Sequence, residues 1–184
     1  MRKMITMTAL FFAVRLIAFG QSDYKMLELV YLEPLPGDDL DAATKAMADH
    51  NKKFHAEAPY KASVWSNLTG SRVGTWVWAM SPANFTAYDN RPAGNDHDSD
   101  WDKTIAPYFK MIDNEYWRQD DKLSYEPADS KSGSMVIWTI FDIKPGDTYR
   151  FKAMLEKISE VYKEKKYDYN FDVYWNQFDN KNGR

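Results

Sequence analysis

Cysteine is absent from the 184 residues of the chain. This absence excludes disulfides, thiolate metal ligands, cysteine nucleophiles and a lipid-anchored N-terminal cysteine. An excess of basic residues is missing too, because 24 Lys and Arg stand against 27 Asp and Glu, for a net charge of −3. Proteins that bind nucleic acid carry a basic surface. We therefore expect no nucleic-acid partner.

A long apolar run is also missing. The apolar stretch over residues 4–14 is shorter than the roughly 20 residues of a membrane-spanning helix. Two basic residues precede it, and Ala-Phe-Gly at 18–20 fits the pattern before a signal-peptidase site at Gln21. We predict a signal peptide over residues 1–20, export to the periplasm or the medium, and no membrane association after cleavage. Arg15 keeps an alternative open, in which this segment is an N-terminal helix.

Apolar residues make up 44% of the chain and aromatic residues 16%, which is enough for an ordinary core and excludes disorder on composition. Part of this material is repeated. Residues 29–38 (LVYLEPLPGD) resemble residues 138–147 (WTIFDIKPGD), and residues 60–67 resemble residues 169–176. The alternative is a chance similarity between two unrelated β-α-β segments.

A helical pattern lies between the paired segments in both copies. Apolar side chains recur at intervals of three and four, which indicates one buried helix face. In the first copy these are Leu40, Ala43, Met47, His50 and Phe54, and in the second they are Phe151, Met154, Leu155, Ile158, Val161 and Tyr162.

The first copy continues beyond its β-α-β part. A strand is predicted over residues 75–80, and a short helix from Ser81-Pro82. A further helix is predicted over residues 101–112, which Pro107 should kink or divide, and a last strand over residues 115–125. This β-α-β-β-α-β order is that of the split ferredoxin-like unit. Its four strands lie in the order 4-1-3-2.

The second copy stops after β-α-β. We predict an α+β protein of tandem ferredoxin-like units, with the first unit over residues 25–127, a linker over residues 128–134 and the first half of a second unit over residues 135–184. A unit without strands 3 and 4 leaves backbone groups unpaired. The chain is therefore expected to be a fragment that lacks roughly 50 residues.

Two such units with aromatic strands resemble the dimeric α/β-barrel superfamily, which includes the antibiotic-biosynthesis-monooxygenase-like domains. The resemblance covers about residues 25–184 and rests on the order of elements. It implies sheets packed face to face, either between repeats of one chain or in a homodimer. It also implies that an enzyme of this kind would be a cofactor-independent or haem-using monooxygenase, although other members have no known activity.

His50 occupies a position on the apolar face of the first predicted helix. It is the candidate catalytic residue, as a proton carrier or a haem-iron ligand facing a cavity between helix and sheet. The alternative is a neutral core histidine with one hydrogen bond. His55, at the end of the same helix, is expected to be a solvated cap. No cofactor is predicted, and haem is the alternative to having none.

Four residues on two neighbouring predicted strands are candidates for binding a flat or apolar small molecule. They are Trp65, Asn67, Trp76 and Trp78, with Asn67 as the polar anchor. The alternative is that the aromatic side chains only fill the core and the interface between the repeats.

Alternating acidic residues over residues 96–102 suggest a calcium loop, but Trp101 stands where such a loop needs glycine and Pro107 where it needs glutamate. Acidic residues at a helix N-terminus are favoured without metal, so no metal site is predicted. Two functions remain: an exported domain that binds a small apolar or aromatic ligand in a helix–sheet cavity, and an exported, non-catalytic structural or interaction domain.

Overall fold

The computed structural model describes residues 25–37, 39–130 and 133–178. The predicted signal peptide lies outside the described residues. The elements are β1 (Met26–Pro34), α1 (Leu40–Phe54), β2 (Ala62–Ser66), β3 (Trp76–Ala83), α2 (Phe85–Asp89), α3 (Asn95–Thr104), β4 (Phe109–Gln119), α4 (Thr148–Lys165) and β5 (Tyr174–Asn176).

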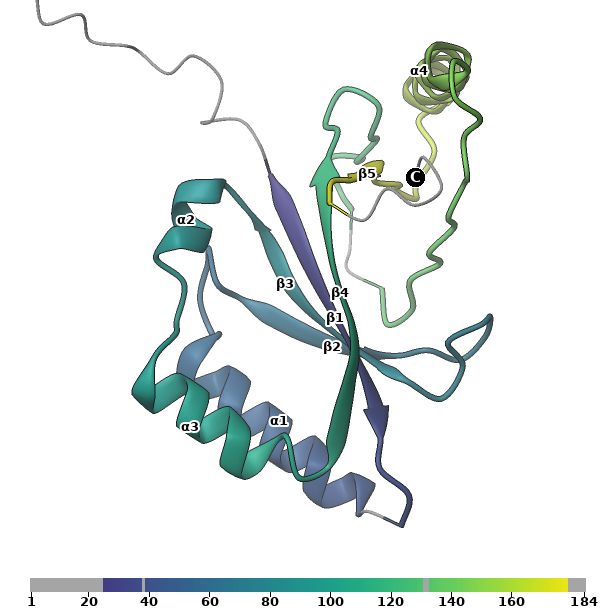
Figure 1. The fold of residues 1–184 in the computed structure, drawn as a ribbon. Helices are drawn as coiled ribbons and strands as arrows, with labels where there is room; N and C mark the ends of the chain where they lie inside the picture. The colour runs from purple at the N-terminus through teal and green to yellow at the C-terminus, as the bar shows by residue number, and fades with distance from the viewer. Residues whose placement is uncertain (1–24, 38, 131–132, 179–184) are drawn as a thin grey trace, which may run out of the picture.

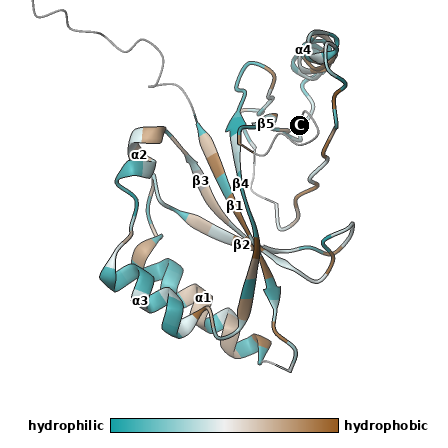
Figure 2. Ribbon diagram, in the orientation of Figure 1, coloured by the Kyte–Doolittle hydropathy of each residue, from teal (hydrophilic) through white to brown (hydrophobic). Residues whose placement is uncertain are grey.

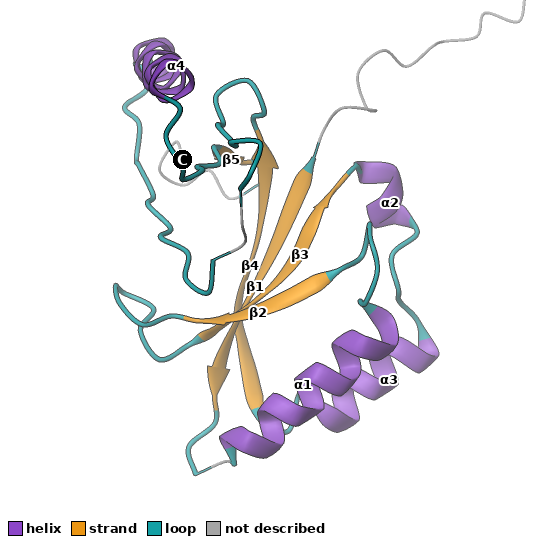
Figure 3. Cartoon of the chain, turned by 180° about the vertical axis from the view of Figure 1, so that it is seen from behind, coloured by secondary structure: helices purple, strands orange, loops and turns teal. Residues whose placement is uncertain are grey.

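The strands form one five-stranded sheet in the order β2-β3-β1-β4-β5, and every neighbouring pair is antiparallel. Helices α1 and α3 lie side by side on one face of the sheet (Figure 1). Seen from behind, α4 lies well apart from this pair, near the described end of the chain (Figure 3). The α+β class is confirmed, and β1 to β4 have the β-α-β-β-α-β order and the 4-1-3-2 strand order expected for residues 25–127.

The alternation of side chains along β1 gives the sheet two apolar faces. Val30 and Leu32 point toward the helices, whereas Leu29 and Tyr31 point to the other side. Helix α1 begins at its N-cap Asp39, whose carboxylate accepts two backbone amide hydrogens. The helix-side core consists of Val30, Leu32, Ala43, Met47, Trp78, Met80, Ile105 and Phe109.

Several boundaries in the second half of the first unit differ from the prediction. The helix ends at Thr104 rather than continuing to residue 112, and β4 runs from Phe109 to Gln119 rather than over residues 115–125. Pro107 has no amide hydrogen for a helix and disfavours helical geometry in the residue before it, so the helix ends before it instead of kinking. Strand β3 likewise runs through Pro82, and α2 starts only after its N-cap Asn84.

The described residues contain no second ferredoxin-like sheet. The β-rich apolar run predicted at the start of the second copy, within residues 138–147, does not form a strand. The segment from residue 135 to 143 is neither helix nor strand, and most of its apolar side chains are exposed, with Ile137 at 92%. Figure 2 shows hydrophobic residues along this segment, which leads to α4. Helix α4 lies where a helix was predicted. β5 pairs with β4 of the first unit, since that edge offers free backbone groups.

No helix among the described residues is long and apolar enough to cross a membrane.

Candidate metal centre and pocket

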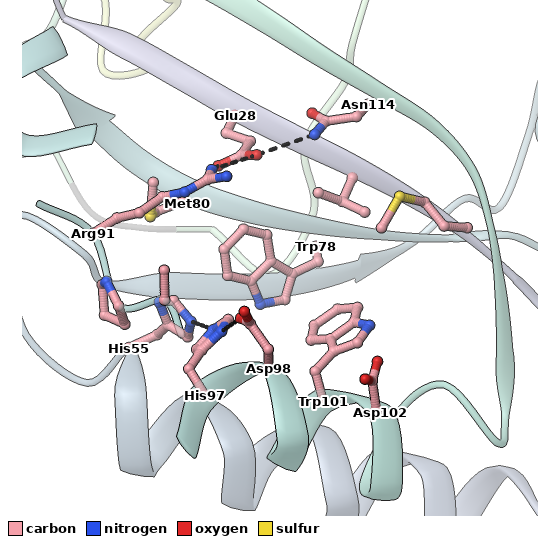
Figure 4. A pocket seen from close by; sticks show the side chains of 14 residues that line it. Glu28, His55, Trp78, Met80, Arg91, His97, Asp98, Trp101, Asp102 and Asn114 are labelled. Atoms are coloured by element: carbon pink, nitrogen blue, oxygen red, sulfur yellow. Dashed lines mark hydrogen bonds and ion pairs between the residues drawn. The ribbon is translucent and has the colours of Figure 1, made fainter. Parts of the chain in front are cut away.

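A cavity of about 270 Å³ lies between α3, the α2–α3 connection and the sheet (Figure 4). Its apolar wall includes Trp78 and Trp101, whose rings meet nearly at a right angle with centroids 6.4 Å apart. The polar side chains lie at its margins. They include Glu28, Arg91 and Asn114 on one side and His55, His97 and Asp98 on another.

The three histidines of the chain come together at this cavity. One ring nitrogen from each lies within 4.8 Å of the other two, and the ring centroids form a triangle with sides of 5.0, 5.2 and 5.5 Å. We call His50, His55 and His97 the histidine cluster. Imidazole nitrogens so arranged could hold a metal ion.

His50 lies on the buried face of α1 and is 1% exposed. Its Nδ1 lies 2.8 Å from Asp100 Oδ2 on α3. Its Nε2 is buried and has no hydrogen-bond partner among the described residues. The ring is thus fixed on one side and unsatisfied on the other.

His55 is the C-cap of α1, but it is 3% exposed, so the prediction of a solvated cap is wrong about its environment. Its Nδ1 lies 3.1 Å from the Tyr60 carbonyl oxygen. His97, in the first turn of α3, has Nδ1 2.9 Å from Asp98 Oδ1. The Nε2 atoms of His55 and His97 are 3.1 Å apart.

These contacts define the ring protons. A carbonyl oxygen and an ionised carboxylate only accept, so each Nδ1 must donate. A neutral imidazole has one N–H, and its Nε2 then carries a lone pair. All three lone pairs therefore belong to the Nε2 atoms, and those of His55 and His97 face each other at 3.1 Å.

The electrostatics favour neutral rings for His50 and His55 and ionised carboxylates for Asp98 and Asp100 near neutral pH. Burial lowers the pKa of His50, and it lowers the pKa of His55 to about 4. The hydrogen bond from His50 lowers the pKa of Asp100, and that from His97 lowers the pKa of Asp98. Metal binding requires neutral imidazole.

Aromatic rings surround the histidine cluster. Phe54 and Trp101 lie 5.1 and 5.3 Å from the His50 ring, and Trp78 lies 5.0 Å from the His55 ring, measured between centroids. Trp78 is itself fixed, because its Nε1 donates to Asn51 Oδ1 at 2.8 Å. These rings restrict how far the imidazoles can turn.

Glu28 is the buried acid at the opposite margin of the pocket, at 3% exposure. Both its oxygens accept from Arg91 Nη1, at 3.0 and 2.8 Å. Its Oε1 also accepts from Tyr116 Oη at 2.8 Å and Asn114 Nδ2 at 3.2 Å. Three side chains thus donate hydrogen bonds to this buried carboxylate.

The structure separates the residues predicted as a ligand site. Trp78 lines the pocket, and His50 belongs to the histidine cluster beside it. Trp76 packs against Phe109 in the core beneath the helices. Trp65 is paired with Val77, which lies on the other face of the sheet, so Trp65 faces away from the pocket. Asn67 also lies outside it and donates to Thr75 Oγ1 at 2.8 Å.

No protein-family model, no curated protein and no solved structure matches this chain.

Proposed function

We propose that residues 25–127 bind a small molecule with an apolar or aromatic body in the cavity between α3 and the sheet. The observation that carries this proposal is the cavity itself, at about 270 Å³ and walled by Trp78 and Trp101. Ligand pockets typically measure about 300 Å³ or more, so the ligand is small.

The polar margins support the same function. The histidine cluster lies at one margin of the cavity, and the Glu28–Arg91 pair lies at another. A few fixed polar groups around an apolar wall are what orients a small ligand. His50, proposed as catalytic from the sequence, would act here as a member of the cluster.

The wider proposal is an exported domain of the dimeric α/β-barrel kind. In it, the outer face of the sheet would pack against a second unit, from a longer chain or from a second copy. If the domain is an enzyme, a cofactor-independent or haem-using oxygenation is the activity that this resemblance implies.

A second function, that of an exported interaction domain, is favoured by one specific observation. The segment from residue 135 to 143 exposes Met135, Ile137 and Phe141 without strand partners. Exposed apolar surface of this kind marks interaction sites.

The experiment that tests ligand binding is a fragment screen by ligand-observed NMR on the purified protein. Trp101→Ala should abolish binding of the aromatic fragments that wild type selects. Trp65→Ala is the matched control, because Trp65 lies on the other face of the sheet. Equal loss in both variants, or no fragment bound by wild type, would contradict the proposal. Haem titration tests the haem version, which an unchanged Soret band would end.

A further inference from the structure

We propose that His50, His55 and His97 bind one divalent transition-metal ion of the zinc class through their Nε2 atoms, with a free coordination position toward the pocket. The inference begins with the buried, unpartnered Nε2 of His50. A buried nitrogen without a partner is destabilising, because it has lost its hydrogen bond to water and gained none in return. Such an atom needs an explanation, and a bound ion is one.

The second observation is the contact between His55 and His97. Their Nε2 atoms lie 3.1 Å apart, while the Nδ1 of each faces an acceptor. Two neutral rings held this way direct lone pairs at each other, which is repulsive. A cation between them converts the repulsion into two bonds.

The spacing suits a metal of this size. A Zn–N bond of about 2.0–2.1 Å in tetrahedral geometry separates the ligand nitrogens by about 3.3 Å. The nitrogens of the histidine cluster lie within 4.8 Å of one another, and one pair is already at 3.1 Å. Small rotations about the side-chain bonds would complete the triad.

The hydrogen-bond acceptors around the three rings are of the same types as those around metal-bound histidines. Metal-bound histidines almost always donate their other N–H to a carboxylate or a backbone carbonyl. Here the three acceptors are Asp100, Asp98 and the Tyr60 carbonyl. Asp100 is itself held by Lys53 Nζ at 3.0 Å. These acceptors fix both the tautomer and the orientation of each ring.

The types of ligand limit which metal ions the site could bind. Three imidazoles without thiolate suit zinc, copper, nickel and iron rather than calcium or magnesium. Three protein ligands leave a fourth tetrahedral position open, which is the pattern of catalytic rather than structural zinc. His55 and His97, but not His50, line the pocket, so the open position faces it.

This last point rests on the proposed function and deepens it. A ligand of the pocket would carry an oxygen or nitrogen donor for the metal beside its apolar body. The metal would thus supply the polar anchor that the sequence suggested for Asn67, which lies elsewhere.

The test is a titration of the chelator-treated 184-residue chain with Co²⁺ followed by Zn²⁺. We expect one Co²⁺ per chain with the visible bands of a four-coordinate ion, and displacement by Zn²⁺. Long-range ¹H–¹⁵N spectra should show the change at Nε2 rather than Nδ1. His97→Gln should weaken Zn²⁺ binding by at least about 100-fold, because it removes one of three ligands.

Asp96→Asn is the matched control, one residue away in the same turn and exposed, and it should bind Zn²⁺ as wild type does. His50→Gln, checked by circular dichroism for its fold, should behave as His97→Gln does. Equal affinity in wild type and His97→Gln, or no binding by wild type at 100-fold excess of metal, would overturn the metal site. Fragment binding that survives in His97→Gln would leave the pocket standing without the metal. Trp101→Ala tests fragment binding by the pocket, and its Zn²⁺ affinity is measured beside it because Trp101 also contacts the His50 ring.

Discussion

The Nε2 atoms of His55 and His97 face each other at 3.1 Å, although the two residues are 42 positions apart. The contact joins the end of α1 to the start of α3. Both rings are held from behind, by the Tyr60 carbonyl and by Asp98. The fold therefore fixes the arrangement on both sides of the contact. The contribution of the acceptors that hold the rings can be tested by mutation.

Replacing either carboxylate behind the rings should weaken metal binding without removing it. Asp98→Asn and Asp100→Asn keep an oxygen that accepts from Nδ1, but they lose the negative charge that makes the imidazole a better ligand. We expect Zn²⁺ affinity to fall by about 10-fold in each variant. Competition against a chromophoric chelator measures it, with Asp96→Asn as control. Unchanged affinity in both variants would show that these carboxylates do not support the ligands.

The stability of the metal-free protein should decrease as the pH falls from about 6.5 to 4. Burial lowers the folded-state pKa of His55 to about 4, and Arg91 adds nearby positive charge. An unfolded histidine has a pKa of about 6.5, so the unfolded chain binds the proton first. The free energy of unfolding then falls by up to about 1.4 kcal/mol per pH unit for this group, and the contribution is complete above pH 6.5.

Urea denaturation in the presence of a chelator at pH 7.5, 6 and 5 measures this slope. His55→Gln cannot take up the proton, so its stability should depend less on pH than that of wild type. An equal slope in the two proteins would show that His55 does not titrate in this way.

Loss of Arg91 should destabilise the fold through Glu28. Arg91→Ala leaves a carboxylate that is 3% exposed with only Tyr116 and Asn114 as donors. Breaking a buried pair costs about 3–5 kcal/mol. Because Arg91 itself is partly exposed and water can replace it, we expect a loss of about 2 kcal/mol in the free energy of unfolding.

Urea denaturation at pH 7 checks the loss, with the exposed Lys103→Ala as control. The double variant Arg91→Ala/Glu28→Gln should regain part of the stability, since the amide carries no charge. If the double variant is less stable than Arg91→Ala alone, an uncompensated charge at Glu28 is not the cause.

Local patterns in the sequence predicted many of the strands and helices of the first unit. A repeated β-rich apolar run predicted the strand that contains Val30 and Leu32, and the 3–4 spacing predicted α1 with Ala43 and Met47 on its buried face. Pro107 marked the end of a helix, but the pattern beyond it was read as helix instead of strand. Apolar residues near a proline fit both periods.

The histidine cluster was not predicted, because its members belong to segments that only the fold brings together. His97 was passed over inside an acidic loop, and Asp98 and Asp100 were examined as calcium ligands or helix-dipole partners. In the structure these two carboxylates accept from His97 and His50. A sequence signal did exist, since His50 and His55 frame the end of one helix and the third histidine stands among carboxylates.

Local sequence patterns could not predict on which face of the sheet Trp65 lies. Trp65 and Trp78 lie on neighbouring strands, but which residue stands opposite which depends on the register. The structure pairs Trp65 with Val77, one residue before Trp78, and this single step directs the two tryptophans to opposite faces.

The last prediction concerns the segment from residue 133 to 147, which should be cut by protease before residues 25–127. It contains neither helix nor strand, and Met135, Ile137 and Phe141 are exposed. Its main anchor is Trp138, whose ring lies 5.5 Å from those of both Trp117 and Tyr174.

Trp138→Ala should therefore speed cleavage in this segment, because a contact between aromatic rings contributes about 0.5–1.5 kcal/mol beyond its area. Ile137→Ala is the matched control, since that side chain is 92% exposed and should leave the rate unchanged. Limited proteolysis with chymotrypsin and mass spectrometry identifies the cuts and their rates. Equal resistance of this segment and residues 25–127 in wild type would mean that the segment is packed against a partner, such as a second copy, and dilution would then restore the cleavage.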